Sequence, residues 1–296
     1  MRERIAVVTT SYPEGPGDPS GHFVETDVRA LEARGADVEV FALRGEAFGW
    51  PGVASRLADK PWRVLGASRT MWRVHRAITH LGSFSRVIAH WALPCAWPIA
   101  AGVPNLEIVS HGGDVRLLAG LPHRMRDQAL QLLLQNTRVW RFPSETLLAD
   151  LLLLSSPEVA EKLRRIARVE APPIDLDVDP KAIARARERQ RSLANGAPAF
   201  VSAARLISSK RIDRAVDIAM RERAALFVIG DGPEREGLEA YARKRRAHAH
   251  FFGKMSRPET LAHIAAADAV VHTSEAEGLS SVIREAEALG VRVLSA

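Results

Sequence analysis

The feature that most constrains the fold is an alternation of short apolar runs with helical patterns, which occurs twice. The first series runs from Ile5 to Leu154, and the second begins at Ala199 and continues to the end of the chain. Strands that alternate with helices in this way are joined by crossover connections and lie parallel in one sheet. The sequence therefore predicts an α/β protein with two Rossmann-like domains.

The pattern changes between residues 172 and 196. Two prolines are followed by an aspartate-rich loop, by a highly charged stretch that is either a helix or a linker, and by Asn195-Gly196, which favours a turn. We therefore expect an N-terminal domain over residues 1–172, a linker over 173–196 and a C-terminal domain over 197–296. Ligands of open α/β sheets bind outside the carboxyl ends of the strands, so two such sheets facing each other would form a cleft.

Two glutamates surround the start of a predicted helix near the end of the chain. Glu277 comes eight positions before Glu285, and Gly278, Leu279 and Ser280 directly follow the first glutamate. Backbone N–H groups at a helix start favour anions such as a diphosphate, whereas a carboxylate accepts hydrogen bonds from hydroxyls. Five or six helical residues span roughly 8–9 Å at about 1.5 Å per residue. The pattern therefore suits a sugar and a ribose on either side of a diphosphate.

Charge and cysteine content narrow the function classes. Lysine and arginine total 41 against 35 aspartates and glutamates, so the formal net charge is 41 − 35 = +6. No predicted helix carries a dense basic stripe interleaved with aromatic residues, so we expect no nucleic-acid partner. The single cysteine, Cys95, excludes a disulfide within the chain and indicates a reducing, cytoplasmic location. No run of about 18 apolar residues occurs, so no transmembrane helix is predicted.

Several motifs are spread over nearly the whole chain. They are SGHFVETDVRALEARGADVEVFA from Ser20, SHGGDV from Ser110, VSAARLISSKRIDRAVDIA from Val201, LFVIGDGPEREGLEAYA from Leu226, and the final pair of glutamates. Together these segments resemble the family 4 retaining glycosyltransferases of the GT-B fold. The resemblance implies two Rossmann-like domains facing across a cleft. It also implies transfer of a hexosyl group from a nucleotide-diphosphate-sugar to a hydroxyl acceptor, with retention, without a metal and without a cofactor other than this donor co-substrate.

The resemblance also implies roles for individual residues in the C-terminal domain. Glu277 would hold hydroxyls of the donor sugar, and backbone N–H groups near Gly278, Leu279 and Ser280 would contact the diphosphate. Glu285 would bind the nucleotide ribose. These expectations agree with the preference of helix starts for anions and of carboxylates for hydroxyls.

Four further residues complete the expected site. Arg205 and Lys210 would neutralise the diphosphate and stabilise it as it leaves, His111 would lie near the reacting sugar, and Gly21 would let the backbone approach the diphosphate. Cleavage of the donor builds negative charge on the diphosphate, which two fixed cations and a helix N-terminus can stabilise.

Other residues have structural explanations. Asp114 either caps the following helix or contacts substrate, and His90 and Trp91 are expected to pack in the interior. The segment from Gly230 to Pro233 is expected to be a turn. No metal site is predicted, although three aspartates alternate in the expected inter-domain loop: Asp175, Asp177 and Asp179.

The segment over residues 60–80 combines tryptophans with basic residues. It is either a helix with an ordinary basic outer face or a surface that contacts an anionic membrane from the cytoplasmic side. In the second case the acceptor would be a lipid-linked sugar, and in the first a soluble sugar or other small molecule. The residues concerned are Lys60, Trp62, Arg63, Arg69, Trp72, Arg73 and Arg76.

The chain also departs from the family pattern. Ser280 stands where the family often has a second glycine, and the sequence ends at Ala296, before the segment with which the family normally returns to its first domain. We therefore expect an incomplete C-terminal domain, for which an oligomer could compensate. Two alternatives stay open, namely a non-catalytic nucleotide-sugar-binding or scaffold protein and a GT-B-like nucleotide-sugar epimerase.

Overall fold

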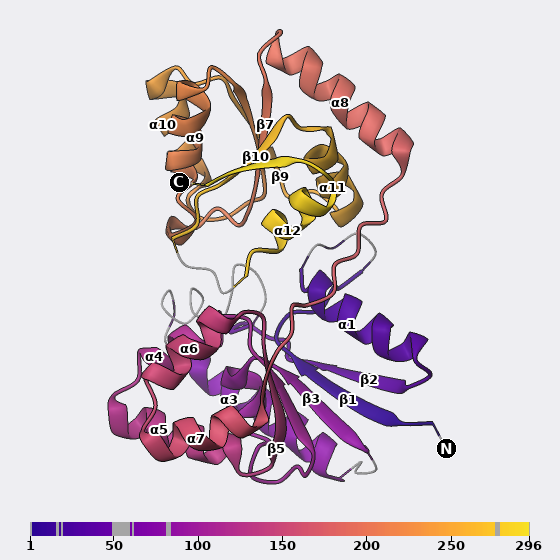
Figure 1. Ribbon diagram of the computed structural model, residues 1–296, viewed down its shortest axis with the longest axis vertical. Coiled ribbons are helices and arrows are strands. Elements are labelled where there is room, and N and C mark those ends of the chain that lie inside the picture. Colours follow the sequence, from indigo (N-terminus) through magenta and orange to yellow (C-terminus); the bar gives the residue numbers. More distant parts are fainter. Residues whose placement is uncertain are drawn as a thin grey trace. The chain divides into compact units, whose positions relative to one another are not determined.

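The computed structural model describes residues 2–15, 18, 20–48, 60, 62–80, 84–275 and 279–295. The chain divides into two compact units, one formed by Met1–Glu14 and Ser20–Pro173 and the other by Gly15–Pro19 and Ile174–Ala296. Each unit has helices packed on a parallel sheet, as Figure 1 shows. The expected α/β fold with two Rossmann-like domains is therefore confirmed.

The first unit contains a six-stranded parallel sheet in the order β2-β1-β3-β4-β5-β6. Its strands are β1 (Arg4–Thr9), β2 (Asp37–Ala42), β3 (Arg86–His90), β4 (Leu106–Val109), β5 (Thr137–Phe142) and β6 (Ala167–Val169). Its described helices are α1 (His22–Ala33), α3 (Arg63–His80), α4 (Gly113–Ala119), α5 (His123–Leu134), α6 (Glu145–Leu153) and α7 (Pro157–Ile166), together with the short segment η1 (Ala92–Ala96), which is kinked at the extended residue Leu93.

Both faces of this sheet are buried, which explains the continuous apolar character of β1. Alternate residues of a strand point to opposite faces, so Ile5 and Val7 pack with the apolar face of α1. Ala6 and Val8 belong to the larger cluster on the other face, to which α3 to α7 and η1 contribute. Cys95 is fully buried in that cluster, as its apolar neighbours predict.

The second unit contains a five-stranded parallel sheet in the order β11-β10-β7-β8-β9. Its strands are β7 (Ala199–Ala203), β8 (Ala225–Ile229), β9 (Ala249–Gly253), β10 (Ala269–His272) and β11 (Arg292–Ser295). Its described helices are α8 (Pro180–Ala194), the short 3₁₀ helix η2 (Ser208–Lys210), α9 (Ile212–Arg221), α10 (Arg235–Arg245), α11 (Arg257–Ala266) and α12 (Ser281–Ala288). One face packs on α9 and α10, and the other on α8, α11 and α12.

The charged segment before β7 forms helix α8 and is part of the second unit. The Asp179 side chain accepts a hydrogen bond from the Lys181 backbone N–H at the start of this helix, and Asn195 ends it in the left-handed conformation. The buried Gln190 donates to the backbone carbonyl of His263 in α11 over 3.0 Å. This contact joins α8 to the helices that cover the second sheet.

The order of the strands determines where each sheet can bind a ligand. In the first sheet β1 and β3 are neighbours, and the chain continues from β1 to β2 on one side and from β3 to β4 on the other. In the second sheet β7 and β10 are neighbours, and the chain continues from β7 to β8 on one side and from β10 to β11 on the other. Loops diverge at such a switch point and leave a crevice outside the carboxyl ends of the two strands. A ligand is therefore expected at the β1–β3 edge of the first sheet and at the β7–β10 edge of the second.

Candidate functional site

At the edge of the second sheet, the loops that follow β7 and β10 are joined by hydrogen bonds. The Glu275 backbone N–H donates to the Ser209 carbonyl over 3.1 Å, and the Thr273 hydroxyl donates to the Lys210 carbonyl over 2.9 Å. The Lys210 ammonium donates to the Ser274 hydroxyl over 3.3 Å. Lys210 is therefore held against the loop that leads to the expected diphosphate site.

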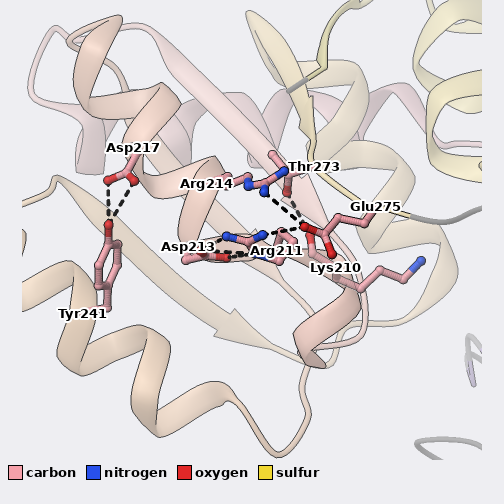
Figure 2. Close-up of polar contacts among 8 residues, drawn as sticks. All are labelled: Lys210, Arg211, Asp213, Arg214, Asp217, Tyr241, Thr273 and Glu275. Atoms are coloured by element: carbon pink, nitrogen blue, oxygen red, sulfur yellow. Dashed lines mark hydrogen bonds and ion pairs between the residues drawn. The ribbon is translucent and has the colours of Figure 1, made fainter.

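An ion-pair cluster fixes the same loop from the side of α9. Arg211 pairs with both Asp213 and Glu275, and Arg214 contacts the Glu275 carboxylate over 3.1 Å. Figure 2 shows Glu275 reaching into this cluster while the Lys210 side chain extends away from it. Hydrogen bonds to the two carboxylates raise the pKa of the Arg211 guanidinium, and the bond from Arg211 lowers the pKa of Asp213. Arg211 and Asp213 therefore stay ionised at neutral pH.

Arg205 is positioned by the turn that follows β8. Gly230 has φ +134°, and a Cβ there would collide with the carbonyl oxygen of Ala204. Ala204 donates its N–H to Ile229 over 3.0 Å, and Leu206 donates to Asp231 over 2.9 Å. The Gly-Asp-Gly-Pro segment is thus the expected turn, and it supports the backbone on both sides of Arg205.

Helix α12 carries the second of the two predicted glutamates. Ser280 occupies the N-cap position of this helix, and Leu279 precedes it with 38 % of its surface exposed. Glu285 is only 1 % exposed, and one of its carboxylate oxygens lies 2.9 Å from a guanidinium nitrogen of Arg257. A buried carboxylate requires such compensation. Glu277 and Gly278 lie outside the described residues.

At the edge of the first sheet, Gly21 begins helix α1. Its φ of +69° is left-handed, and a Cβ would collide with the carbonyl of Ser11 in the loop after β1. The Thr9 hydroxyl donates to the same carbonyl over 3.0 Å and accepts from the Ser11 N–H over 3.1 Å. The structure therefore places Gly21 in a tight turn that requires glycine for its own backbone packing.

His111 follows β4 and lies beside aromatic and histidine rings. Its ring stacks on His90 with an interplanar angle of 14°, and its Nε2 is 3.0 Å from His90 Nδ1. Phe23 and Trp91 each have ring centroids 4.7 Å from the His111 ring. His90 is fully buried, as the packing interpretation predicts, but it also has polar contacts.

Asp114 organises the loop that carries His111. Its fully buried carboxylate accepts hydrogen bonds from the Ala92 N–H at 2.9 Å, the Ser110 hydroxyl at 2.8 Å and the His111 N–H at 3.1 Å. Burial raises the pKa of Asp114, although these donors act in the opposite direction. Gly112, and not Asp114, occupies the N-cap position of α4. The carboxylate therefore holds the loop in place.

Ionisation of the two histidines is suppressed. Burial, and then the neighbouring Arg141 guanidinium, lower the pKa of His90 to about 3. Burial, His90 and Arg141 lower the pKa of His111 well below its usual range, and Asp27 only partly opposes this. Both imidazoles are therefore neutral at physiological pH, so His111 can offer a lone pair or an N–H but no positive charge.

The structure also brings in residues that the sequence did not indicate. Asp27 from α1, Glu107 from β4 and Arg141 from β5 form a largely buried ion-pair group next to His90. Arg257 from α11 contacts Glu285. These residues come from separate motifs, and no spacing pattern in the sequence connects them.

The aspartates before α8 have local structural partners. Asp175 accepts from the Asp177 N–H over 3.0 Å, and Asp179 caps α8. Among the described residues, no group of three or more histidine, cysteine, aspartate or glutamate side chains is arranged to hold a metal ion. Within the same described ranges, no helix has the length and apolar character needed to cross a membrane.

Comparisons with known proteins agree with this architecture. Residues 184–296, which include α9, α12 and the β7–β10 edge, match the family model of glycosyl transferases group 1. Among curated proteins, no match to the chain was found.

Solved structures match over almost the whole chain. HepE from Anabaena, in complex with UDP and glucose, has a TM-score of 0.69 and 18% identity, with 99% of this chain and 80% of that chain covered. Sucrose-phosphate synthase from Thermosynechococcus elongatus matches with a TM-score of 0.67 and 18% identity, and the match covers 99% of this chain and 81% of that chain. WaaG, a glycosyltransferase involved in lipopolysaccharide biosynthesis, matches with a TM-score of 0.63 and 17% identity, and the match covers 98% of this chain and 80% of that chain. The chain shares its fold, the GT-B fold, with these structures.

Proposed function

We propose that this chain is a retaining glycosyltransferase that moves a hexosyl group from a nucleotide-diphosphate-sugar to a hydroxyl acceptor. The observation that carries the proposal is the junction at the β7–β10 edge. There the Lys210 ammonium contacts Ser274, in the loop that leads to α12, and the backbones of the two loops are hydrogen-bonded. Ligands of open α/β sheets bind at such a switch point.

The charges at this edge suit a leaving diphosphate. In the proposal, Lys210 and Arg205 neutralise the diphosphate, and N–H groups near Gly278, Leu279 and Ser280 bind its oxygens at the start of α12. Two fixed cations would supply the stabilisation that a metal gives elsewhere, so we propose that transfer needs no metal.

The two glutamates would bind the groups on either side of the diphosphate. We assign donor-sugar hydroxyls to Glu277 and the nucleotide ribose to Glu285. Because Arg257 already contacts the buried Glu285 carboxylate, ribose binding would use the remaining acceptor capacity of that group. Arg257 would then orient the carboxylate.

The first unit would contribute His111 near the reacting sugar. Its neutral imidazole is suited to accept a hydrogen bond from a sugar hydroxyl, and Phe23 and Trp91 give it apolar surroundings. Gly21 would allow the turn after β1 to approach the diphosphate. Any other residue at this position would bring its Cβ into collision with the Ser11 carbonyl in that turn.

The family match supports a nucleotide-sugar donor, because it covers the part of the chain that holds Lys210 and Glu285. HepE was crystallised with UDP and with UDP-glucose, which makes UDP-sugars the first donors to examine. The donor base is uridine, guanosine or adenosine, and the experiment below compares all three.

Turnover with product stereochemistry tests the proposal. Purified protein would be incubated with UDP-, GDP- and ADP-sugars and with panels of soluble and lipid-linked sugar acceptors, in the presence of a metal chelator. We expect release of one nucleoside diphosphate and a product whose anomeric configuration, read from proton NMR coupling, equals that of the donor. An inverted product contradicts retention, and conversion of the donor into an epimer without acceptor indicates the epimerase alternative.

We also propose that α3 contacts an anionic membrane, so that the acceptor is lipid-linked. Trp62 at its start and Leu65 and Trp72 on the helix are 65 %, 70 % and 57 % exposed. The Arg76 guanidinium lies 4.9 Å from the centre of the Trp72 ring. Exposed tryptophans together with basic side chains are typical of helices that lie on anionic bilayers.

A further inference from the structure

His111 lies at one end of a chain of polar contacts that leads into the first unit. His111 Nε2 is 3.0 Å from His90 Nδ1, and His90 Nε2 is 3.5 Å from Asp27 Oδ2. The His90 side chain is 2 % exposed and that of Asp27 is 14 % exposed. The three residues come from the loop after β4, from β3 and from α1, so the contact chain connects three elements.

The Asp27 end of this chain is anchored by a second group of charges. Arg141 donates to Asp27 Oδ2 over 3.0 Å, and Glu107 on the neighbouring strand contacts the Arg141 Nε. Arg141 and Glu107 are themselves largely buried. The guanidinium balances the Asp27 charge and fixes the direction of the carboxylate, so the oxygen that faces His90 has a defined position.

The contact chain determines which imidazole nitrogens carry protons. His90 Nε2 and Asp27 Oδ2 face each other at 3.5 Å without meeting hydrogen-bond geometry, so the proton is placed by electrostatics. A lone pair on Nε2 would be repelled by the negative oxygen, and this nitrogen is therefore the N–H. Since His90 is neutral, its Nδ1 is then an acceptor, and the facing His111 Nε2 must donate to it. His111 is also neutral, which leaves its Nδ1 as a lone pair.

The remaining nitrogen of His111 is in a position to be used by a ligand. The His111 residue is only half-buried, and in the described part of the chain no hydrogen bond engages its Nδ1. We propose that Asp27 and His90 are positioning residues that hold His111 in this tautomer, so that Nδ1 accepts a hydrogen bond from a hydroxyl of the bound donor sugar. The ligand part of this proposal rests on the proposed function.

The proposal limits what His111 can do. With a lone pair at Nδ1, His111 orients a hydroxyl but does not donate a proton to the leaving group. Burial and Arg141 keep both imidazoles neutral, which is the state that the tautomer requires. A donor analogue in which the contacted hydroxyl is methylated would lose this hydrogen bond, because it has no proton to donate.

The tautomers can be read directly from the nitrogen chemical shifts of the imidazoles. Protein labelled with ¹⁵N-histidine would be studied at neutral pH by long-range proton–nitrogen correlation, with signals assigned from His90→Asn and His111→Asn variants. We expect the Nε2–H tautomer for both residues. A His111 signal from the Nδ1–H tautomer or from the imidazolium overturns the proposal, whatever the protein's activity.

An Asp27→Ala variant tests the role of the carboxylate. Arg141 and His90 Nε2 both contact Asp27 Oδ2, so alanine removes the acceptor that faces His90 and leaves its Nε2 near the Arg141 guanidinium. A cation favours a lone pair on Nε2, so both histidines should shift toward the Nδ1–H tautomer. Glu25→Ala, on the same helix, is the matched control and should leave the signals unchanged. An unchanged His111 tautomer in Asp27→Ala would show that Asp27 does not position it.

Kinetics separate this inference from the proposed function. The hydrogen bond forms to the bound donor, so Asp27→Ala should raise the donor KM by roughly three- to tenfold, the worth of one hydrogen bond, with a smaller change in kcat. If the parent protein transfers no sugar from any donor, the proposed function fails, but the NMR spectra still decide the tautomer. If transfer occurs and the donor KM is unaffected by Asp27→Ala, the positioning role fails alone.

Discussion

Single glycine positions fix the loop that carries Arg205. Gly230 adopts a φ of +134° and lies so close to Ala204 that a Cβ would meet its backbone. We expect Gly230→Ala to destabilise the second unit by about 2–4 kcal/mol, because the conformation is strained for alanine and the collision is with main chain. Hydrogen exchange of β7 and β8 peptides at increasing urea concentration would measure this.

Gly237 is the matched control for that substitution. It lies exposed on α10, and nothing lies within 4 Å of a Cβ built there. Gly237→Ala should therefore stabilise the helix by about 0.5–1 kcal/mol. Equal effects of the two substitutions would contradict the packing of the turn on Ala204.

The buried His90 predicts a dependence of stability on pH. Its pKa is about 3 in the fold against an ordinary value of 6.5, so between these values the unfolded chain binds more protons than the native one. The contribution to stability is fully present above pH 6.5 and is lost as the pH falls through this window. The slope approaches about 1.4 kcal/mol per pH unit.

Fluorescence can isolate this effect, since all six tryptophans precede residue 173 and report on the first unit. Denaturant unfolding between pH 4.5 and 7.5 should show a shallower pH slope in His90→Gln than in the parent protein. His123→Gln removes a histidine whose side chain is 65 % exposed and should leave the slope unchanged. Carboxylates that titrate in the same range contribute equally to the slope of the variant and to that of the parent, so their contribution cancels in the comparison. Identical slopes in His90→Gln and the parent would contradict the account.

At the scale of elements, most of both sheets could be predicted from hydrophobic runs. The apolar runs predict strands at residues 5–9, 38–42, 87–90, 107–110, 139–142, 199–203, 225–230, 250–252 and 269–272. Strands β1 to β5 and β7 to β10 lie within two residues of these runs. Among the described elements of the first unit, those not predicted are η1, α4, α7 and β6. Helix α7 has a clear apolar face, but β6 has only three residues, and η1 depends on tertiary contacts such as the bond from Ala92 to Asp114.

The Arg211–Glu275 cluster predicts how the loop after β10 behaves. Glu275→Gln removes the charge that Arg211 and Arg214 hold, so the loop before α12 should exchange its amide hydrogens several-fold faster. The overall free energy of unfolding should change by less than about 1 kcal/mol, because these groups are partly exposed. Exchange mass spectrometry of peptides from residues 269–280 measures this.

Glu239→Gln is the control for the loop. Glu239 is paired with Arg235 on α10 in a contact of similar exposure. It should not alter exchange after β10. If Glu275→Gln and Glu239→Gln gave the same exchange in that loop, the cluster would not be what holds it.

For the whole molecule, the sequence could predict the residue types of the candidate site better than their surroundings. Lys210 lies in the loop after strand β7, and Ser280 lies directly before helix α12. The alternation of strands and helices predicts that both lie at the carboxyl edge of the sheet. Two sets of contacts could not be predicted: that of Arg257 with Glu285, and those that connect Asp27 through His90 to His111. Their residues lie far apart in the sequence, and only the packing of the fold brings them together.

The exposed face of α3 gives a prediction for the behaviour of the molecule at membranes. We expect flotation with vesicles rich in anionic lipid, reduced when Arg69, Arg73 and Arg76 are replaced by glutamine and also by Trp72→Ser. Replacing three exposed arginines of α8, namely Arg185, Arg187 and Arg191, removes the same charge without a neighbouring tryptophan. An equal loss in this control would assign binding to net charge, and no flotation of the parent protein would contradict the proposal.

The most direct test of a nucleotide-sugar site at the β7–β10 edge is calorimetric titration of UDP, GDP and ADP. We expect saturable binding of one nucleotide, weakened roughly ten- to hundredfold by Lys210→Ala and by Glu285→Gln, since each removes a charge-assisted contact. Lys244→Ala on α10 and Glu287→Gln on α12 change exposed residues of the same unit and should leave affinity unchanged. Binding of none of the three nucleotides, or equal binding by all four variants, would contradict the account.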